Sequence, residues 1–549
     1  MHKSALLALA CLCGLAAFAK DPRENRRFLK QIPNNDKIPH ALNRLTYGPR
    51  PGDLERVRAM GLKKWIELEL HPERISENSA LTAKLKMLDS LAMSSAELVR
   101  DYPTPQMVRQ MVAGQTPFPS DPDRRMLIEK LVAKAERQLG QGEQPAPAAV
   151  LRTGTPQQRL AAFQALPADQ QDDAIAALPA GVRQALFQIA PPGLRRKLEM
   201  ADGPQQVVAR DLMEGKLLRA IYSERQLDEV LADFWFNHFN VFLDKGADHY
   251  LVTEYEREAI RPHVLGRFRD LLEATAKSPA MLFYLDNWQS VGPEPPKRRG
   301  QGNRARRGLN ENYGRELLEL HTLGVGGGYT QKDVTEVARC FTGWTIDQPQ
   351  RGGSFQFNPR LHDNGEKIVL GATIAAGGGI QDGETVLDIL ARHPSTAHFI
   401  STRLAQRFVA DDPPAALVNR MAQTFLKTGG DLREVMRTML ASKEFWSVGA
   451  YRSKVKSPLE MVASAVRAVH GDVDFAFALA NQVAQLGEPL YRKPEPTGYS
   501  DSSQEWINSA GLLARMNFAL QLAHDKVPGV KVEVARAATE LGSPEFQKR

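Results

Sequence analysis

Helical periodicity is the feature that most constrains how this chain folds. Apolar residues recur three and four positions apart through most of the sequence, as at Leu54, Val57 and Met60. This spacing gives each helix one apolar stripe, which must be buried against a neighbouring element. Residues 353–375 instead alternate like short strands. The sequence therefore predicts a mainly α fold, a large multi-helix domain with one small β-hairpin.

Prolines at a fixed spacing mark a distinct segment within that domain. The composition shifts toward Ala, Gln, Pro and Arg in residues 117–206, where proline occupies positions 167, 179 and 191, each 12 residues apart. A proline ends one helix and fits the first turn of the next, so this spacing predicts a run of short helices. We interpret residues 117–206 as an inserted short-helix subdomain with an exposed linker at 141–147.

The N-terminus resembles a secretory signal. His2 and Lys3 precede an apolar run, and Ala17-Phe18-Ala19 is a small-x-small cleavage site. The apolar run is shorter than the ~20 residues that span a bilayer, and no later segment is apolar for that length. We expect an exported protein, periplasmic or extracellular, without a transmembrane segment. A lipoprotein cleavage at Cys11 is the less favoured alternative, because it leaves a very short apolar core.

Cysteine usage and charge exclude several classes of protein. The chain has 3 cysteines, and only Cys340 lies beyond the signal, so stability must come from packing without an intramolecular disulfide. We favour a buried, inert thiol at Cys340 over a nucleophile. A net charge of +7 over 549 residues is too dilute to indicate nucleic acid binding. Six Lys and Arg residues cluster in the loop 292–308, which we interpret as a solvated surface loop rather than a site for an acidic polymer.

The predicted organisation along the chain has five parts. They are a signal peptide at 1–19, the N-terminal helical part of the main domain at 20–116, the inserted segment at 117–206, the main helical domain at 207–525 with its basic loop, and a C-terminal tail at 526–549.

The densest group of polar residues lies on a predicted helix within Asn310–Gly324. At 100° per residue, Arg315, Glu316 and Glu319 fall with one asparagine within an arc of about 100°, and Glu311 lies beside it. On an exposed helix these residues form ordinary i,i+4 pairs that contribute about 0.3–0.5 kcal/mol each. Facing inward, they provide carboxylates with separated pKa values around an Arg, which suits acid–base catalysis. The spacing leaves both interpretations open.

Histidines supply the other candidate catalytic residues. His321 lies on the leucine side of the same helix, and His238 lies among aromatic residues, where a buried core histidine is the default interpretation. His362 and Asp363 occupy a glycine-containing loop, a better position for function, although an Asx turn explains the same residues. A metal bound by these histidines with Glu316 or Glu319 lacks the usual ligand spacing, so no metal site is predicted and the cofactor stays undetermined.

Several strings together resemble a large bacterial family, the domain of unknown function numbered 1800. They occupy residues 40–70, 234–242, 279–287, 309–344, 362–371, 393–414 and 487–518. The family's hallmark is similar to Asn310–Gly324 followed by Tyr329–Val334 and Thr342-Gly343-Trp344. The resemblance implies an exported protein with no established activity or cofactor, and a partner with a sulfatase-like fold, because many members are encoded beside one. The proline-spaced segment has no counterpart in these strings.

Two functions follow from these observations. The first is an exported hydrolase or lyase that acts on an extracellular polymer. In it, Glu311, Glu316 and Glu319 serve as acid, base or ligand carboxylates and Arg315 as an anion clamp, while His238, His321, His362 and Asp363 assist. The second is a non-catalytic envelope scaffold, or a partner of the sulfatase-like protein, in which the charged helix is a lattice of salt bridges.

Overall fold

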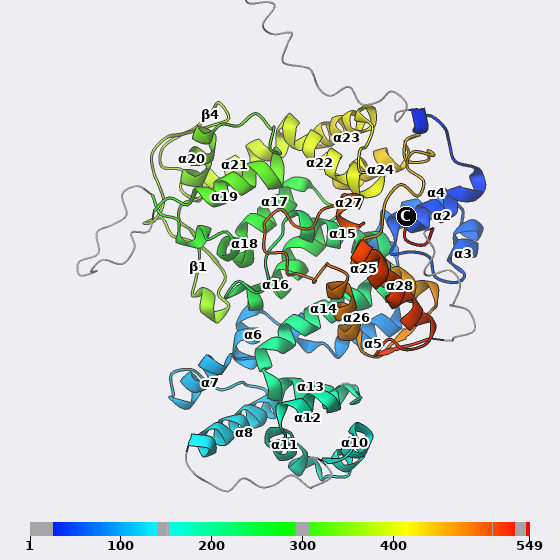
Figure 1. Ribbon diagram of the computed structural model, residues 1–549. Helices are drawn as coiled ribbons and strands as arrows, with labels where there is room; N and C mark the ends of the chain where they lie inside the picture. Colours follow the sequence, from blue (N-terminus) through cyan, green and yellow to red (C-terminus); the bar gives the residue numbers. More distant parts are fainter. Residues whose placement is uncertain are drawn as a thin grey trace, which may run out of the picture.

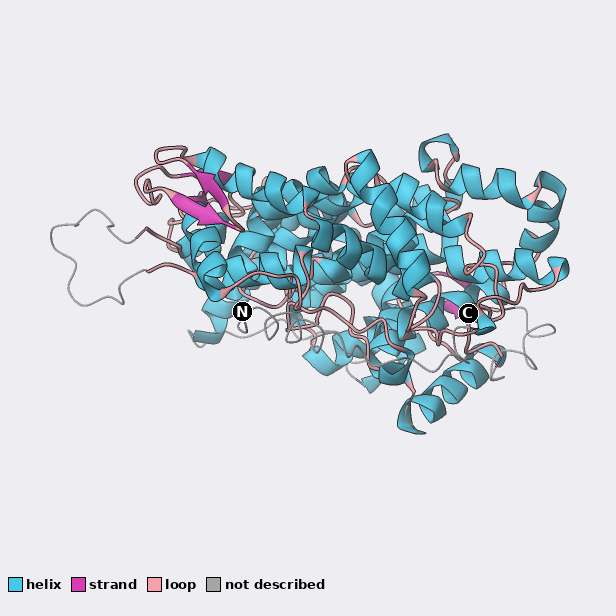
Figure 2. Ribbon diagram, turned by 90° about the horizontal axis from the view of Figure 1, so that it is seen from above, coloured by secondary structure: helices cyan, strands magenta, loops and turns pink. Residues whose placement is uncertain are grey.

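The computed structural model describes residues 26–139, 151, 153–187, 189–292, 308–507, 509–532 and 545–549. The expected mainly α fold is confirmed, and the strands are small beside the helices (Figure 2). The proposed signal, the linker at 141–147 and the basic loop, apart from its ends Gly292 and Gly308, lie outside the described residues. Within the described ranges, no helix has both the length and the apolar character needed to cross a membrane.

The first two described helices are separated by the glycine- and proline-containing residues 48–52. In chain order the helices are α2 (Asn34–Leu45), α3 (Asp53–Met60), α4 (Leu62–Glu69), α5 (Ser79–Lys86), α6 (Ser95–Asp101), α7 (Pro105–Val112) and α8 (Pro122–Leu139). Single 3₁₀ turns, Pro72–Arg74 and Asp89–Ala92, join some of them. Helices α2 to α4 lie on one side of the main body (Figure 1).

The proline-spaced segment forms short helices, as predicted. They are α10 (Pro156–Gln164), α11 (Ala168–Ala177), α12 (Ala180–Phe187) and α13 (Pro192–Asp202). Three of them begin within one residue of the prolines at 167, 179 and 191. Leu178, Leu186 and Leu198 belong to a separate buried cluster, which also contacts Phe475 of the main body. Helices α8 and α10 to α13 lie together beneath the other helices (Figure 1).

The main body continues with longer helices around one large apolar core. The first group is α14 (Pro204–Tyr222), α15 (Gln226–His238), α16 (Asp248–Glu254), α17 (Phe268–Lys277), α18 (Pro279–Tyr284), α19 (Glu311–Glu316) and α20 (Gln331–Cys340). The second group is α21 (Ile380–Arg392), α22 (Pro394–Phe408), α23 (Ala415–Thr428), α24 (Leu432–Leu440), α25 (Pro458–Ala468), α26 (Ala476–Gln485), α27 (Ser503–Trp506) and α28 (Ser509–Ala523). Two π-helical turns, Tyr255–Ile260 and Leu317–Thr322, directly extend α16 and α19.

Three antiparallel pairs of strands complete the described structure. They are β1 (Trp344–Ile346) with β2 (Phe355–Phe357), β3 (Lys367–Val369) with β4 (Ala372–Ile374), and β5 (Asp472–Val473) with β6 (Val530–Lys531). The alternating residues 353–375 therefore contribute to two hairpins rather than one. Strand β6 and the buried Arg549 both belong to the segment expected to be a tail, and both pack on the main body.

Two helix starts carry capping boxes formed by neighbouring residues. Thr330 and Asp333 form a capping box at α20, and Ser457 and Glu460 form one at α25, each satisfying two backbone N–H groups. Cys340 is buried at the end of α20, and burial raises the pKa of its thiol to about 12. The thiol is therefore protonated near neutral pH, which fits an inert core residue.

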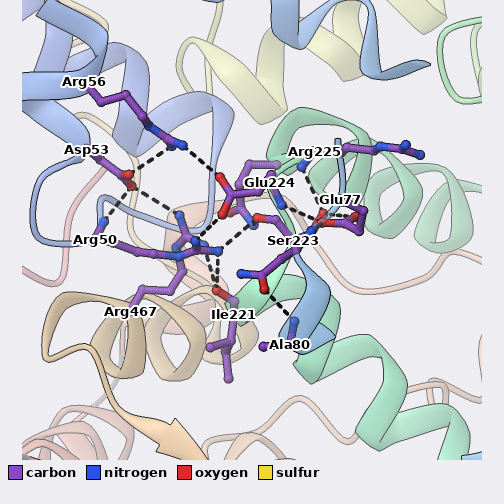
Figure 3. A network of polar contacts seen from close by, with 12 residues as sticks. Arg50, Asp53, Arg56, Glu77, Ala80, Ile221, Ser223, Glu224, Arg225 and Arg467 are labelled. Atoms are coloured by element: carbon purple, nitrogen blue, oxygen red, sulfur yellow. Dashed lines mark hydrogen bonds and ion pairs between the residues drawn. The ribbon is translucent and has the colours of Figure 1, made fainter. Parts of the chain in front are cut away.

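A polar network joins the N-terminal helices to the end of α14 (Figure 3). The guanidinium groups of Arg50 and Arg467 both donate to the Ile221 carbonyl, at 2.9 and 2.8 Å. Glu224 accepts from Arg50 at 2.7 Å and from Arg56 at 2.8 Å. The last carbonyls of a helix have no partner within the helix and carry partial negative charge, so arginines satisfy and stabilise them. This network holds α3 and α25 against α14.

Close packing of α19 on α20 leads to a stability prediction. A Cβ atom at Gly314 would lie 2.8 Å from the Val334 carbonyl oxygen and 3.1 Å from the Ala338 nitrogen, so the two backbones would have to separate. We expect Gly314→Ala to lower the free energy of unfolding by about 1–3 kcal/mol, measured by denaturant titration. The matched control is Gly181→Ala in α12, where no atom lies within 4 Å. It should stabilise the chain by about 0.5–1 kcal/mol, because alanine favours helix. Equal effects of the two changes would contradict the close approach.

Candidate active site

The polar helix predicted within Asn310–Gly324 exists, but its second half changes pitch. The Leu323 N–H donates to the Leu318 carbonyl at 2.8 Å, and the Thr322 hydroxyl donates to the Leu317 carbonyl at 2.6 Å. Both contacts span five residues, as in a π-helix, so an angle of 100° per residue fails beyond Leu317. The single polar arc expected from a regular helix is therefore divided.

The first part of that arc contacts α20. The Gln331 amide donates to Glu311 at 2.7 Å and accepts from Arg315 at 2.7 Å, and the Thr335 hydroxyl donates to Glu311 at 3.0 Å. Glu311 and Arg315 are thus bridged by an amide from the neighbouring helix. These contacts join two helices near the surface, and they fit a structural role.

The second part brings two carboxylates together. Glu316 and Glu319 are half-buried, and the Tyr329 hydroxyl donates to Glu319 at 2.8 Å. Burial and the charge of Glu319 raise the pKa of Glu316, against the opposing effect of Arg315. The two carboxylates therefore lie close enough for the charge of one to affect the pKa of the other.

His238 and His321 lie side by side in the aromatic core. Their ring centroids are 6.4 Å apart, and a ring nitrogen of His238 lies 3.1 Å from the His321 carbonyl oxygen. Burial lowers the pKa of His321 to about 3, and burial together with the Arg403 charge holds the pKa of His238 well below its usual value. Both rings are therefore neutral near pH 7, and His238 fits the interpretation as a core histidine.

His362 and Asp363 belong to a third, fully paired network. The His362 ring nitrogens lie 2.7 Å from the Thr342 carbonyl oxygen and 3.0 Å from Asp382, which also binds Lys367 at 2.5 Å. Asp363 accepts from the guanidinium of Arg339 on α20 at 2.7 and 3.3 Å. Because these side chains are buried and have partners, the network anchors β3 to α20 and α21.

The eight predicted residues consequently form separate groups. Among the described residues, no hydrogen bond or ion pair joins Glu316 or Glu319 to His238 or to His362. In the same part of the chain, no group of three or more His, Cys, Asp or Glu side chains is arranged to hold a metal ion.

A cavity elsewhere in the fold gathers more ionisable groups than any of these clusters. It has a volume of about 40 Å³, enough for about three water molecules, and lies between α14, α15, α22, α25 and the segment 488–506. Its charged lining residues are Lys216, Asp233, Arg407, Glu460, Glu488, Asp501 and Arg549. Three of the strings that carry the family resemblance meet here, 234–242, 393–414 and 487–518.

Ion pairs cross this cavity. Lys216 of α14 binds Asp233 of α15 at 2.8 Å, and Arg407 of α22 binds Glu460 of α25 at 2.8 Å. Arg549 also pairs with Glu460. Removing one partner of a buried ion pair leaves the other charge uncompensated. Each pair therefore fixes its two side chains in position.

Two neighbouring carboxyl groups in the cavity have pKa values shifted in opposite directions. Burial and the charge of Asp233 raise the pKa of Glu488 to about 7, although the Leu459 N–H donates to it at 2.8 Å. Burial also opposes ionisation of Glu460, but the charges of Arg407 and Arg549 outweigh it and lower the pKa. One carboxyl is therefore available as an acid near pH 7 while the other stays ionised, the pattern by which acid and base roles are recognised.

Asn237 and Asn240, on either side of His238, hold the segment 493–499 against the cavity. Asn240 donates to the Lys493 and Glu495 carbonyls, both at 2.9 Å. Asn237 donates to the Tyr499 carbonyl at 2.7 Å and accepts from its N–H at 2.6 Å. In the string around His238, the asparagines rather than the histidine make the contacts to this wall. Nothing in the local pattern marks Asp233 or Glu488, and Glu460 looks like an ordinary capping residue.

Comparison with known families identifies the chain. A family model described as a protein of unknown function, DUF1800, matches residues 40–548. The chain belongs to the DUF1800 family. The match spans the helical body together with the proline-spaced segment, so this DUF1800 protein carries its short helices inside the family region. No curated protein and no solved structure matches the chain.

Proposed function

We propose that this DUF1800 protein is an exported acid–base enzyme, a hydrolase or lyase that acts on an extracellular polymer, with its chemistry at Glu488. The observation that carries the proposal is the pair of carboxyl groups with opposed pKa shifts in one buried cavity. Export rests on the signal-like residues 1–19.

The contacts assign a role to each charged group. Glu488 is the general acid, since its pKa of about 7 keeps it partly protonated at neutral pH. Asp233 is the base, because within the described residues its carboxylate pairs only with Lys216 at 2.8 Å and Arg407 at 3.8 Å, which leaves lone pairs free. Glu460 is held by two guanidinium groups and the Ser457 N–H, so it positions Arg407, whose charge stabilises a developing anion.

Substrate access depends on the segment 493–501. The cavity of about 40 Å³ admits only the reacting group of a substrate. Ser500 is the exposed part of its lining, and Asn237 and Asn240 hold the segment through backbone contacts. A polymer therefore binds along this side, with one linkage reaching Glu488.

Turnover of defined polymers tests the proposal. The mature protein is incubated with a panel of neutral, carboxylated and sulfated polysaccharides; new reducing ends report hydrolysis, and unsaturated products report elimination. We expect Glu488→Gln to lower the rate by about 10²–10⁴-fold, and the wild-type rate to fall as pH rises above about 7, where the acid ionises. Glu316→Gln/Glu319→Gln is the comparison variant. If it abolishes turnover and Glu488→Gln does not, the chemistry lies beside α19 instead.

A non-catalytic scaffold is the second candidate function, and α28 favours it. Ile507, Leu512, Leu513, Met516 and Leu520 have exposed fractions of 43–63%. They expose on the order of 500 Å² of apolar surface, near the upper range for the largest patch of a monomer. The only charged residue in 507–523 is Arg515, which is buried. An uncharged apolar face suits a protein partner, and the family resemblance suggests the sulfatase-like protein.

Light scattering with size-exclusion chromatography tests this scaffold. The chain is analysed alone and mixed with a sulfatase-like protein of the kind encoded beside many members of the family. We expect a complex that Leu513→Lys/Leu520→Lys abolishes, since burying lysines without partners opposes association. A complex that the double variant leaves intact would show that α28 is not the interface. A monomer in both samples would contradict the scaffold.

A further inference from the structure

A groove separate from the cavity lies between the inserted segment and α26. Its volume is about 600 Å³, within the range of ligand sites. Helix α12 contributes Arg183, Gln184 and Phe187, and α26 contributes residues at 478, 481, 482 and 485. In each helix these residues are spaced so that they lie on one face. The faces of two helices therefore line the same groove.

Neutral amide side chains make up much of these two helix faces. Gln184 comes from α12, and Asn481, Gln482 and Gln485 come from α26. Within the described parts of the chain, none of these four side chains makes a hydrogen bond. An amide both donates and accepts hydrogen bonds. Four of them around one groove match a ligand rich in hydroxyl groups.

Aromatic rings form the apolar part of the groove. Phe187 and Phe475 are buried, with ring centroids 5.1 Å apart, and Phe477 lies 6.1 Å from Phe475. These rings belong to the cluster that joins the insert to the main body. Arg195 lies over the Phe475 ring at 4.4 Å and Arg210 lies over the other two rings, so the phenylalanines supply apolar surface beside the amides without a free face for stacking. Such a mixture of apolar and amide groups suits the C–H and hydroxyl groups of a sugar.

The charge of the lining is positive. Arg183 and Arg210 are its ionisable residues, and no Asp or Glu is among the described residues that line it. Arg210 lies over the rings of Phe187 and Phe477 at 5.3 and 5.2 Å, and Glu199 binds it at 3.2 Å. Guanidinium groups bind carboxylates and sulfates through paired N–H donors. The groove therefore favours an anionic ligand.

We propose that this groove binds a segment of an acidic polysaccharide, whose carboxylate or sulfate groups contact Arg183 and Arg210 while its hydroxyl groups contact the four amides. This binding site shares no residue with the acid–base cavity, and it does not depend on catalysis there.

Calorimetric titration of the full chain tests the proposal. The probes are polygalacturonate for carboxylates, dextran sulfate for sulfates, neutral dextran, and polyglutamate as an acidic peptide. We expect at least one acidic polysaccharide to bind about tenfold or more tightly than dextran and polyglutamate, and Asn481→Ala/Gln485→Ala to weaken that binding about tenfold. Both residues are exposed, so the variant should fold. Gln164→Ala, an exposed amide at the end of α10, is the matched control and should bind as wild type.

Three results would overturn the proposal. They are equal binding of dextran, equal or tighter binding of polyglutamate, and unchanged affinity of the Asn481→Ala/Gln485→Ala variant. The two acidic polysaccharides separate carboxylate from sulfate recognition. Glu488→Gln should retain groove binding, so failure of this site and failure of the proposed catalysis are distinguishable.

Discussion

Glu488→Gln is expected to gain stability relative to wild type as pH rises from 5 to 9. The pKa of Glu488 is raised from 4.5 to about 7, so the folded state prefers the protonated carboxyl. Its contribution to stability is fully present below pH 4.5 and is lost as pH rises through 7. Glutamine cannot ionise and does not incur this loss. Between pH 5 and pH 9 the variant should gain about 3 kcal/mol relative to wild type.

Denaturant titrations of both proteins at the two pH values measure this gain. Glu505→Gln is the control, because Glu505 is exposed, and its difference from wild type should not change with pH. The result does not depend on enzymatic activity. A constant difference between Glu488→Gln and wild type at both pH values would mean that Glu488 is not held protonated in the fold.

Glu460→Ala is expected to be the most destabilising single change. It leaves Arg407 and Arg549 buried without their shared carboxylate, and it removes the capping box of α25. Loss of one partner from a buried ion pair costs about 3–5 kcal/mol. Denaturant titration at pH 7 should show a loss of that size in the free energy of unfolding.

A surface pair provides the matched control. Glu67 binds Arg437 at 3.0 Å, with 52% and 31% of their side chains exposed. Glu67→Ala should therefore cost no more than about 1 kcal/mol. Similar losses for the two variants would show that the Glu460 pairs are not buried in solution.

Much of the helical architecture was predictable because its signals are local. Pro167, Pro179 and Pro191 restrict the backbone wherever they occur, and the structure begins short helices beside them. The capping residues at Thr330 and Ser457 act on backbone groups three positions away, and both boxes form. The π-helical turn at 317–322 was not predictable from a fixed period, and it divided the expected arc of carboxylates.

The candidate site was likewise predictable only in part. The string around His238 contributes Asn237 and Asn240 to the cavity, but the cavity also needs Lys216, Glu460 and Glu488. These residues lie far apart in the sequence and share no motif. Their pKa values depend on burial and on charges from other helices, which no local pattern encodes.

The sequence by itself determined the mainly α class, the helix starts, the short helices of the insert and the expectation of a buried Cys340. Each depends on interactions within a few residues, where spacing and side-chain type are sufficient. Only the tertiary structure decided which polar residues share a site, because burial and charge pairing depend on distances between helices that meet in space. It separated the histidines from the carboxylates and placed Glu460 and Glu488 in one cavity.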